Sequence, residues 1–183
     1  MGRLGGQTSG TAIARPEYLN EQGMIFGATY SSMAVAPDGT AAPVVANPVT
    51  DYVPSARPGG RAPHVRLARG GTPISTIDLV GNGFVLLTGR KGKAWKGAAE
   101  RLAADTRLGL EALTIGDDGI EDPDGQWPAS YGLDDAGAVL VRPDGYVGWR
   151  NPSSAVDPTT TLRAVLGGIL GKDVLLFGSG GRV

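Results

Sequence analysis

Cysteine is absent from the 183-residue sequence. The chain can therefore form no disulfide, and it has no thiolate that could act as a nucleophile or bind a metal. Only one histidine, His64, is present. A metal site built on this imidazole would lack neighbouring ligands, and no Ser or Cys nucleophile is placed with it in the sequence. We therefore assign no catalytic residue, no cofactor-binding residue and no metal ligand.

The sequence also has no large excess of charge of one sign and no long run of apolar residues. The formal net charge is −1, which argues against a nucleic acid or an anionic membrane as partner, since neither would be strongly attracted. No stretch approaches 18 consecutive apolar residues, and the N-terminus lacks the basic and then apolar layout of a signal peptide. A chain without cysteine is compatible with a reducing compartment. We expect a soluble, cytoplasmic protein.

Glycine and proline are abundant, with 30 and 13 residues, or about a quarter of the chain. Apolar, patterned segments interrupt them at intervals, so the composition indicates many turns rather than disorder. The length suits one domain. We expect a flexible arm over residues 1–18, the domain over 19–172 and a tail over 173–183.

The first half of the sequence predicts an extended or β-rich N-terminal lead followed by strands. Residues 24–36 alternate loosely and predict a strand, whereas the proline-spaced residues 41–54 predict extended chain without regular pairing. Three further strands, joined by glycine turns at 70–71 and 81–83, are expected at 64–68, 74–80 and 83–89. The last is continuously apolar, which is typical of a central strand buried on both faces.

The second half predicts a βαβ unit followed by a hairpin and a helix. The expected elements are a helix at 94–108 capped by Gly109, a strand at 110–115, an acidic loop at 116–128, a hairpin at 138–149, a helix at 158–170 and a short strand at 174–177. Asp157 and Pro158 suit the N-cap and first position of the final helix. This order predicts an α/β, thioredoxin-like fold. The place of a CxxC motif reads TGRKGKAW, so composition excludes thioredoxin-type redox activity.

A rigid, cationic loop over residues 51–67 carries the candidate interface residues. Prolines fix its backbone and arginines provide planar donors for a carboxylate, a phosphate or a carbonyl. Arg57 and Arg61 either pair with a carboxylate such as Asp51 or Asp78, or contact another domain. His64 either fixes the loop to the following strand through a backbone hydrogen bond or makes an interdomain contact.

Two other groups of residues favour structural roles. The carboxylates of the acidic loop lack the spacing of an EF-hand and predict a solvated loop; they are Asp117, Asp118, Glu121, Asp122 and Asp124. The three tryptophans predict core or interface anchors rather than a cofactor site; they are Trp95, Trp127 and Trp149.

Four motifs in order carry a resemblance to a known family. They are YLNEQGMIFGATYSS (18–32), PSARPGGRAPHVRL (54–67), STIDLVGNGFVLL (75–87) and AVLVRPDGYVGWR (138–150). Together they resemble the C-terminal domain of FAD-dependent aromatic-ring hydroxylases, which act on phenols, chlorophenols and aromatic polyketides. The resemblance covers residues 19–170. It implies a thioredoxin-like domain without the cysteines that is linked to subunit association.

The catalytic half of that family has no counterpart in this sequence, because no GxGxxG turn opens a helix. The resemblance therefore implies a non-catalytic accessory domain that packs against a missing FAD-binding domain and takes part in a homodimer. FAD and NAD(P)H would serve the whole enzyme in hydroxylating a phenolic ring, and this chain would bind neither. The alternative is a stand-alone module that binds a small ligand or a protein, without flavin chemistry.

Overall fold

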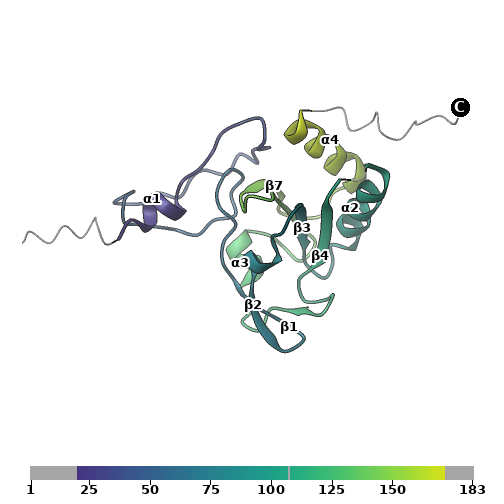
Figure 1. Ribbon diagram of the computed structural model, residues 1–183, viewed down its shortest axis with the longest axis horizontal. Coiled ribbons are helices and arrows are strands. Elements are labelled where there is room, and N and C mark those ends of the chain that lie inside the picture. Colours follow the sequence, from purple (N-terminus) through teal and green to yellow (C-terminus); the bar gives the residue numbers. More distant parts are fainter. Residues whose placement is uncertain (1–19, 107, 172–183) are drawn as a thin grey trace, which may run out of the picture.

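A four-stranded mixed sheet forms the centre of the computed structural model, which describes residues 20–106 and 108–171 (Figure 1). Its strands lie in the order β4-β3-β6-β7. β3 and β4 are parallel, and the other neighbours are antiparallel. The strands are β3 (Phe84–Thr88), β4 (Leu110–Thr114), β6 (Ala138–Val141) and β7 (Val147–Asn151).

The continuously apolar β3 is buried along its whole length in the middle of this sheet. Because successive side chains of a strand point to opposite faces, β3 supplies both halves of the core. Val85 and Leu87 belong to one buried cluster, whereas Phe84 and Leu86 belong to the other. The prediction of a central, doubly buried strand is confirmed.

Two helices cover one face of the sheet, α2 (Lys93–Thr106) and α4 (Pro158–Leu170) (Figure 1). Their apolar stripes pack with Leu86, Leu140 and Trp149 in the same cluster. Asp157 caps α4 as predicted, since its carboxylate accepts a hydrogen bond from the Thr160 N–H at 3.0 Å.

The opposite face carries a small antiparallel sheet in the order β2-β1-β5, together with α3 (Trp127–Tyr131). β1 (Arg66–Arg69) and β2 (Thr72–Ser75) form the predicted hairpin. Its turn uses Gly70 and Gly71, whose φ angles of 57° and 80° favour glycine. β5 (Ile120–Glu121) pairs with β1 from within the acidic loop, which was expected to be irregular.

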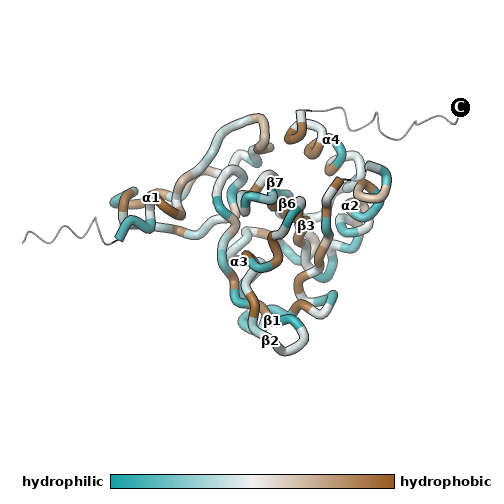
Figure 2. The backbone as a smooth tube through the Cα atoms, in the orientation of Figure 1, coloured by the Kyte–Doolittle hydropathy of each residue, from teal (hydrophilic) through white to brown (hydrophobic). Residues whose placement is uncertain are grey.

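The N-terminal lead, which comprises residues 20–53 of the described chain, departs most from the prediction. Residues 24–36 form no strand: α1 (Gln22–Phe26) is a short helix, and irregular chain follows it as far as β1. Figure 1 shows the lead extending away from the sheets, and Figure 2 shows hydrophobic residues along α1. The alternation was misleading because no neighbouring strand lies there to pair with, and Met24, Ile25 and Tyr30 are exposed. The extended chain predicted at 41–54 is confirmed as irregular.

Four smaller expectations were wrong. Residues 76–79 form the 3-10 helix η2 (Thr76–Leu79) rather than strand, and residues 81–83 connect the two sheets instead of turning a hairpin. α2 ends before Gly109, whose carbonyl accepts a hydrogen bond from the Phe84 N–H. Residues 127–128, which were expected to end the acidic loop, form the start of α3. The strand predicted at 174–177 lies outside the described residues.

From β3 onward the predicted βαβ unit, hairpin and final helix occur in the predicted order, with β5 and α3 lying where a loop was expected. The α/β fold class is therefore confirmed, while the closer likeness to thioredoxin stays a prediction. Among the residues that the structure describes, no helix is both long enough and apolar enough to cross a bilayer.

Candidate docking site

The loop of residues 54–64 lies between β7 and the N-terminal lead. On one side, the Gly59 N–H donates to the Val147 carbonyl and the Val147 N–H donates to the Gly60 carbonyl, both at 2.8 Å. On the other side, the Gly59 carbonyl accepts from the Tyr30 N–H at 2.8 Å. A Cβ at Gly59 would lie 2.2 Å from the Tyr30 carbonyl oxygen, so this close approach requires glycine. The loop therefore joins the lead to the sheet.

Arg57 fastens the lead rather than pairing with a carboxylate. Its Nε donates to the main-chain carbonyl of Thr40 at 2.7 Å. The predicted pairing with Asp51 or Asp78 was wrong, because both carboxylates accept hydrogen bonds from residues of their own loops.

Arg61 lies against aromatic rings. Its guanidinium carbon is 5.6 Å from the centre of the Tyr146 ring and 6.0 Å from that of Phe26. Tyr30 packs edge-on against Tyr146, with 4.9 Å between the ring centres. Among the described residues no carboxylate forms an ion pair with Arg61. A cation held over aromatic rings contributes about 0.5–1 kcal/mol at an exposed site, so Arg61 links α1 to β7 weakly.

His64 is exposed, and its Nδ1 is hydrogen-bonded to the Ser75 hydroxyl at 2.6 Å. It thus contacts β2 through a side chain, not through the expected backbone hydrogen bond. The adjacent Pro63 carbonyl is buried, where it accepts hydrogen bonds from the Thr76 hydroxyl and the Tyr131 hydroxyl. Burial raises the pKa of Tyr131, so its hydroxyl stays protonated as a donor. The loop is therefore rigid here while His64 faces outward.

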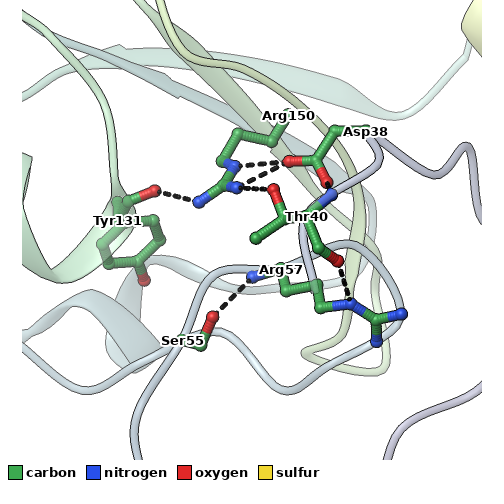
Figure 3. A network of polar contacts seen from close by, with 6 residues as sticks. All are labelled: Asp38, Thr40, Ser55, Arg57, Tyr131 and Arg150. Carbon is green, nitrogen blue, oxygen red and sulfur yellow. Dashed lines mark hydrogen bonds and ion pairs between the residues drawn. The ribbon is translucent and has the colours of Figure 1, made fainter. Parts of the chain in front are cut away.

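A buried ion pair, which the sequence did not reveal, holds the lead to β7 (Figure 3). Arg150 donates to the Asp38 carboxylate through Nε at 2.9 Å and through Nη2 at 2.6 Å. The same Nη2 donates to the Thr40 hydroxyl at 2.7 Å, and Nη1 donates to the Tyr131 carbonyl at 2.9 Å. The side chains of Arg150 and Asp38 are only 8% and 9% exposed. The one signal in the sequence is an arginine inside the apolar pattern VGWR.

Asp38 stays ionised in this setting. Its burial alone would raise the pKa of the carboxyl group. Hydrogen bonds from the Thr40 backbone and hydroxyl and from the Arg150 guanidinium outweigh that effect, so the pKa of Asp38 is lowered. Asp38 is therefore charged at neutral pH, which suits a structural ion pair.

A cavity of about 130 Å³ lies between α1, the lead and the loop. Phe26, Asp51, Tyr52, Arg57 and Arg61 line it, together with backbone and smaller side chains. This lining contains two cations, one carboxylate and aromatic rings, and the Asp51 carboxylate is already hydrogen-bonded to Asn47 and Thr50. The chemistry of this region thus suits contacts with another surface.

The remaining predicted residues have structural roles. The tryptophans Trp95, Trp127 and Trp149 are all buried in the core, as predicted. In the acidic loop, Asp118 pairs with Lys96, and Asp124 pairs with Arg66. Within the part of the chain that the structure describes, no three His, Asp or Glu side chains group in a way that could hold a metal ion.

Known sequences place these features in a family. The family described as "Aromatic-ring hydroxylase, C-terminal" matches residues 55–172. The chain is 41% identical to aklavinone 12-hydroxylase RdmE of Streptomyces purpurascens, over 81% of this chain and 27% of that enzyme. It is 40% identical to 4-methyl-5-nitrocatechol 5-monooxygenase of a Burkholderia species, over 82% of this chain and 29% of that enzyme. The chain thus spans less than a third of these relatives.

Solved structures with a similar fold belong to the same kind of enzyme as the relatives found by sequence. An aklavinone-11 hydroxylase bound to FAD and aklavinone superposes with a TM-score of 0.70 at 39% identity, covering 87% of this chain and 28% of that one. The flavin-dependent monooxygenase PieE, bound to FAD and substrate, gives 0.75 at 37% identity, covering 84% and 27%. Matches in sequence and in structure thus fall on the same quarter of the same kind of enzyme. The chain belongs to the aromatic-ring hydroxylases and corresponds to their C-terminal domain.

Proposed function

We propose that this chain acts as a non-catalytic accessory domain of an FAD-dependent aromatic-ring hydroxylase, with its main role in packing against the FAD-binding part. The observation that carries the proposal is its match to the last quarter of flavin hydroxylases named for aklavinone and 4-methyl-5-nitrocatechol. In the whole enzyme, FAD and NAD(P)H would support hydroxylation of a phenolic ring. That chemistry would lie in the part of the enzyme that this chain does not match.

The described residues do not fit a bound dinucleotide. β3 leads into α2 through residues 89–92, which is the kind of glycine turn that can hold a pyrophosphate. Here the Arg90 N–H donates to the Asp135 carboxylate at 2.9 Å, and the Lys91 N–H donates to the Asp135 carbonyl at 3.0 Å. Asp135 therefore occupies both donors, one through its carboxylate and one through its main-chain carbonyl, and the carboxylate would repel a phosphate. We derive no catalytic step for this chain.

Arg57, Arg61 and His64 are our candidates for interdomain contact. His64 and part of each arginine remain accessible, while the loop that carries them is held on both sides. Such a loop can meet a partner without ordering first, which lowers the entropic cost of docking. We propose the FAD-binding part as that partner, with a second copy of the enzyme as a further one.

The test begins with the purified chain. We expect a colourless protein that neither carries FAD nor retains it after dialysis. Next, the matched C-terminal quarter of the RdmE relative would be replaced by residues 20–171 of this chain. We expect the hybrid to be a folded, yellow flavoprotein, unlike RdmE truncated at the same point. A flavin spectrum from the isolated chain, or a hybrid no better folded than the truncated enzyme, would contradict the accessory role.

A further inference from the structure

Exposed apolar side chains are concentrated in the N-terminal lead. Nine large hydrophobic residues are exposed among those that the structure describes, and seven of them lie between positions 24 and 53. The two outside the lead, Ile77 and Val156, are far from each other in sequence. The seven in the lead are Met24, Ile25, Phe26, Tyr30, Met33, Val44 and Val53. Soluble proteins rarely gather exposed apolar residues in this way unless another surface covers them.

Five of these residues, which we call the lead surface, follow one another along α1 and the turn after it: Met24, Ile25, Phe26, Tyr30 and Met33. Their exposed fractions range from 40% at Phe26 to 80% at Met33. Figure 2 shows hydrophobic chain along α1, at the end of the lead that lies away from the sheets. The five side chains therefore stay exposed in this domain, although Tyr30 packs on Tyr146.

The chain that directly follows the lead surface is attached to β7 and to the loop of residues 54–64. The Ala36 N–H donates to the Gly148 carbonyl at 2.8 Å, and Val35 is buried. The Asp38–Arg150 ion pair and the Arg57–Thr40 hydrogen bond add two further attachments. Fixing irregular backbone costs conformational entropy, and these attachments have already met that cost. This arrangement thus presents apolar side chains in a preformed shape that costs little more to cover.

We infer that the lead surface is the docking surface for the FAD-binding part of the hydroxylase, an inference that rests on the proposed function. In the relatives, the region matched by this chain is the C-terminal quarter, so the other three quarters precede it and reach this domain through the lead. The lead surface is thus next to the point where that part joins. Arg57 and Arg61 adjoin Phe26 around the same cavity, and among the described residues neither forms an ion pair, since the Asp51 carboxylate that also lines this cavity is bonded to Asn47 and Thr50. The complementary face is an apolar patch with acidic side chains at its edge.

The test uses the RdmE hybrid and replaces the three non-aromatic members of the lead surface together, as Met24→Ser, Ile25→Ser and Met33→Ser. The matched control is Val156→Ser, which removes an exposed apolar side chain outside the lead. We expect the lead variant to raise the rate of proteolytic cleavage at the domain junction at least about tenfold, because buried apolar anchors dominate interfaces. Its thermal unfolding should separate into two transitions. The control hybrid should keep the slow cleavage and the single transition of the unsubstituted hybrid.

The same substitutions in the isolated chain distinguish docking from folding. We expect its Tm to change by no more than about 2 °C, since exposed side chains contribute little to its own stability. Equal cleavage of the lead and control hybrids would overturn the inference while leaving the accessory role intact. A hybrid that fails to fold before any substitution would contradict the accessory role itself. Sedimentation of the isolated chain as a dimer that the lead variant abolishes would assign the surface to a second copy, and so overturn the inference.

Discussion

Arg150 couples two parts of the molecule that the sequence keeps far apart. Asp38 lies 112 positions before it, yet the two side chains meet with almost no exposure to water. Burying two charges costs free energy that their attraction offsets only when every donor and acceptor is satisfied. Here the guanidinium also bonds to Thr40 and to the Tyr131 carbonyl. The pair is therefore sensitive to the loss of either partner.

Replacing Arg150 tests this at the residue scale. We expect Arg150→Met to lower the free energy of unfolding by about 3 kcal/mol, because Asp38 would remain buried without a counter-charge. The matched control is Arg66→Met, which removes the exposed bidentate pair with Asp124. Surface pairs contribute less than about 1 kcal/mol. Urea unfolding of both variants measures the difference, and equal costs would show that the buried pair has no special weight.

The lowered pKa of Asp38 gives a pH dependence with a definite sign. The unfolded state takes up a proton at higher pH than the folded state, so the pair's stabilisation is complete above the unfolded pKa and is lost as pH falls through the folded one. We expect the free energy of unfolding to fall as the pH drops below about 5, and to fall less steeply in Asp38→Asn. Asp118, whose pKa is lowered by Lys96, should account for part of the remaining slope. Identical slopes in the two proteins would refute this account.

At the scale of single elements, the sequence predicts well where local pattern and tertiary setting agree. β3, α2 and α4 are long apolar or amphipathic runs, and each was found close to its predicted position. The stretch 24–36 carries a strand-like alternation, but a strand also needs a neighbour, and pairing is not a local property. The two-residue β5 could not be predicted for the same reason, since its pairing with β1 alone defines it.

The junction between β3 and α2 offers a prediction at this scale. A Cβ at Gly92 would lie 1.6 Å from the Thr88 hydroxyl oxygen, which is buried and donates to the Gly137 carbonyl. We expect Gly92→Ala to destabilise the protein by about 3 kcal/mol through overpacking. Gly97→Ala, one turn into α2, meets only the end of the flexible Arg101 side chain. It should stabilise the protein by about 0.5–1 kcal/mol, as alanine favours helix.

The Tm and the free energy of unfolding in urea should therefore fall in Gly92→Ala and rise in Gly97→Ala. A Gly92→Ala protein as stable as the parent would mean that β3 and α2 can separate at little cost. Destabilisation by Gly97→Ala would mean that α2 packs more tightly around that position than its surroundings indicate.

At the scale of the whole molecule, the candidate site was only partly predictable. The loop of Arg57, Arg61 and His64 stood out because proline, glycine and arginine are conspicuous in sequence. The contacts of those residues could not be predicted. Arg57 bonds to a backbone carbonyl and Arg61 lies over aromatic rings, and neither interaction leaves a pattern in the sequence. Asp38 resembles an ordinary turn residue until the fold brings it to Arg150. Long-range contacts of this kind depend on how the lead attaches to β7, which the local sequence does not specify.

Removing the lead tests how the parts depend on one another. In a chain shortened to residues 55–171, Arg150 would lose Asp38 and Thr40 and become accessible to water. We therefore expect this shorter chain to unfold cooperatively at a lower temperature than the full chain. Within it, Arg150→Met should cost less than about 1 kcal/mol, against about 3 kcal/mol in the full chain, because coupled sites are not additive. Urea unfolding of the four proteins gives the coupling directly. An equal cost in both backgrounds would mean that Arg150 acts through Tyr131 alone, and loss of cooperative unfolding in the shorter chain would make the lead part of the core.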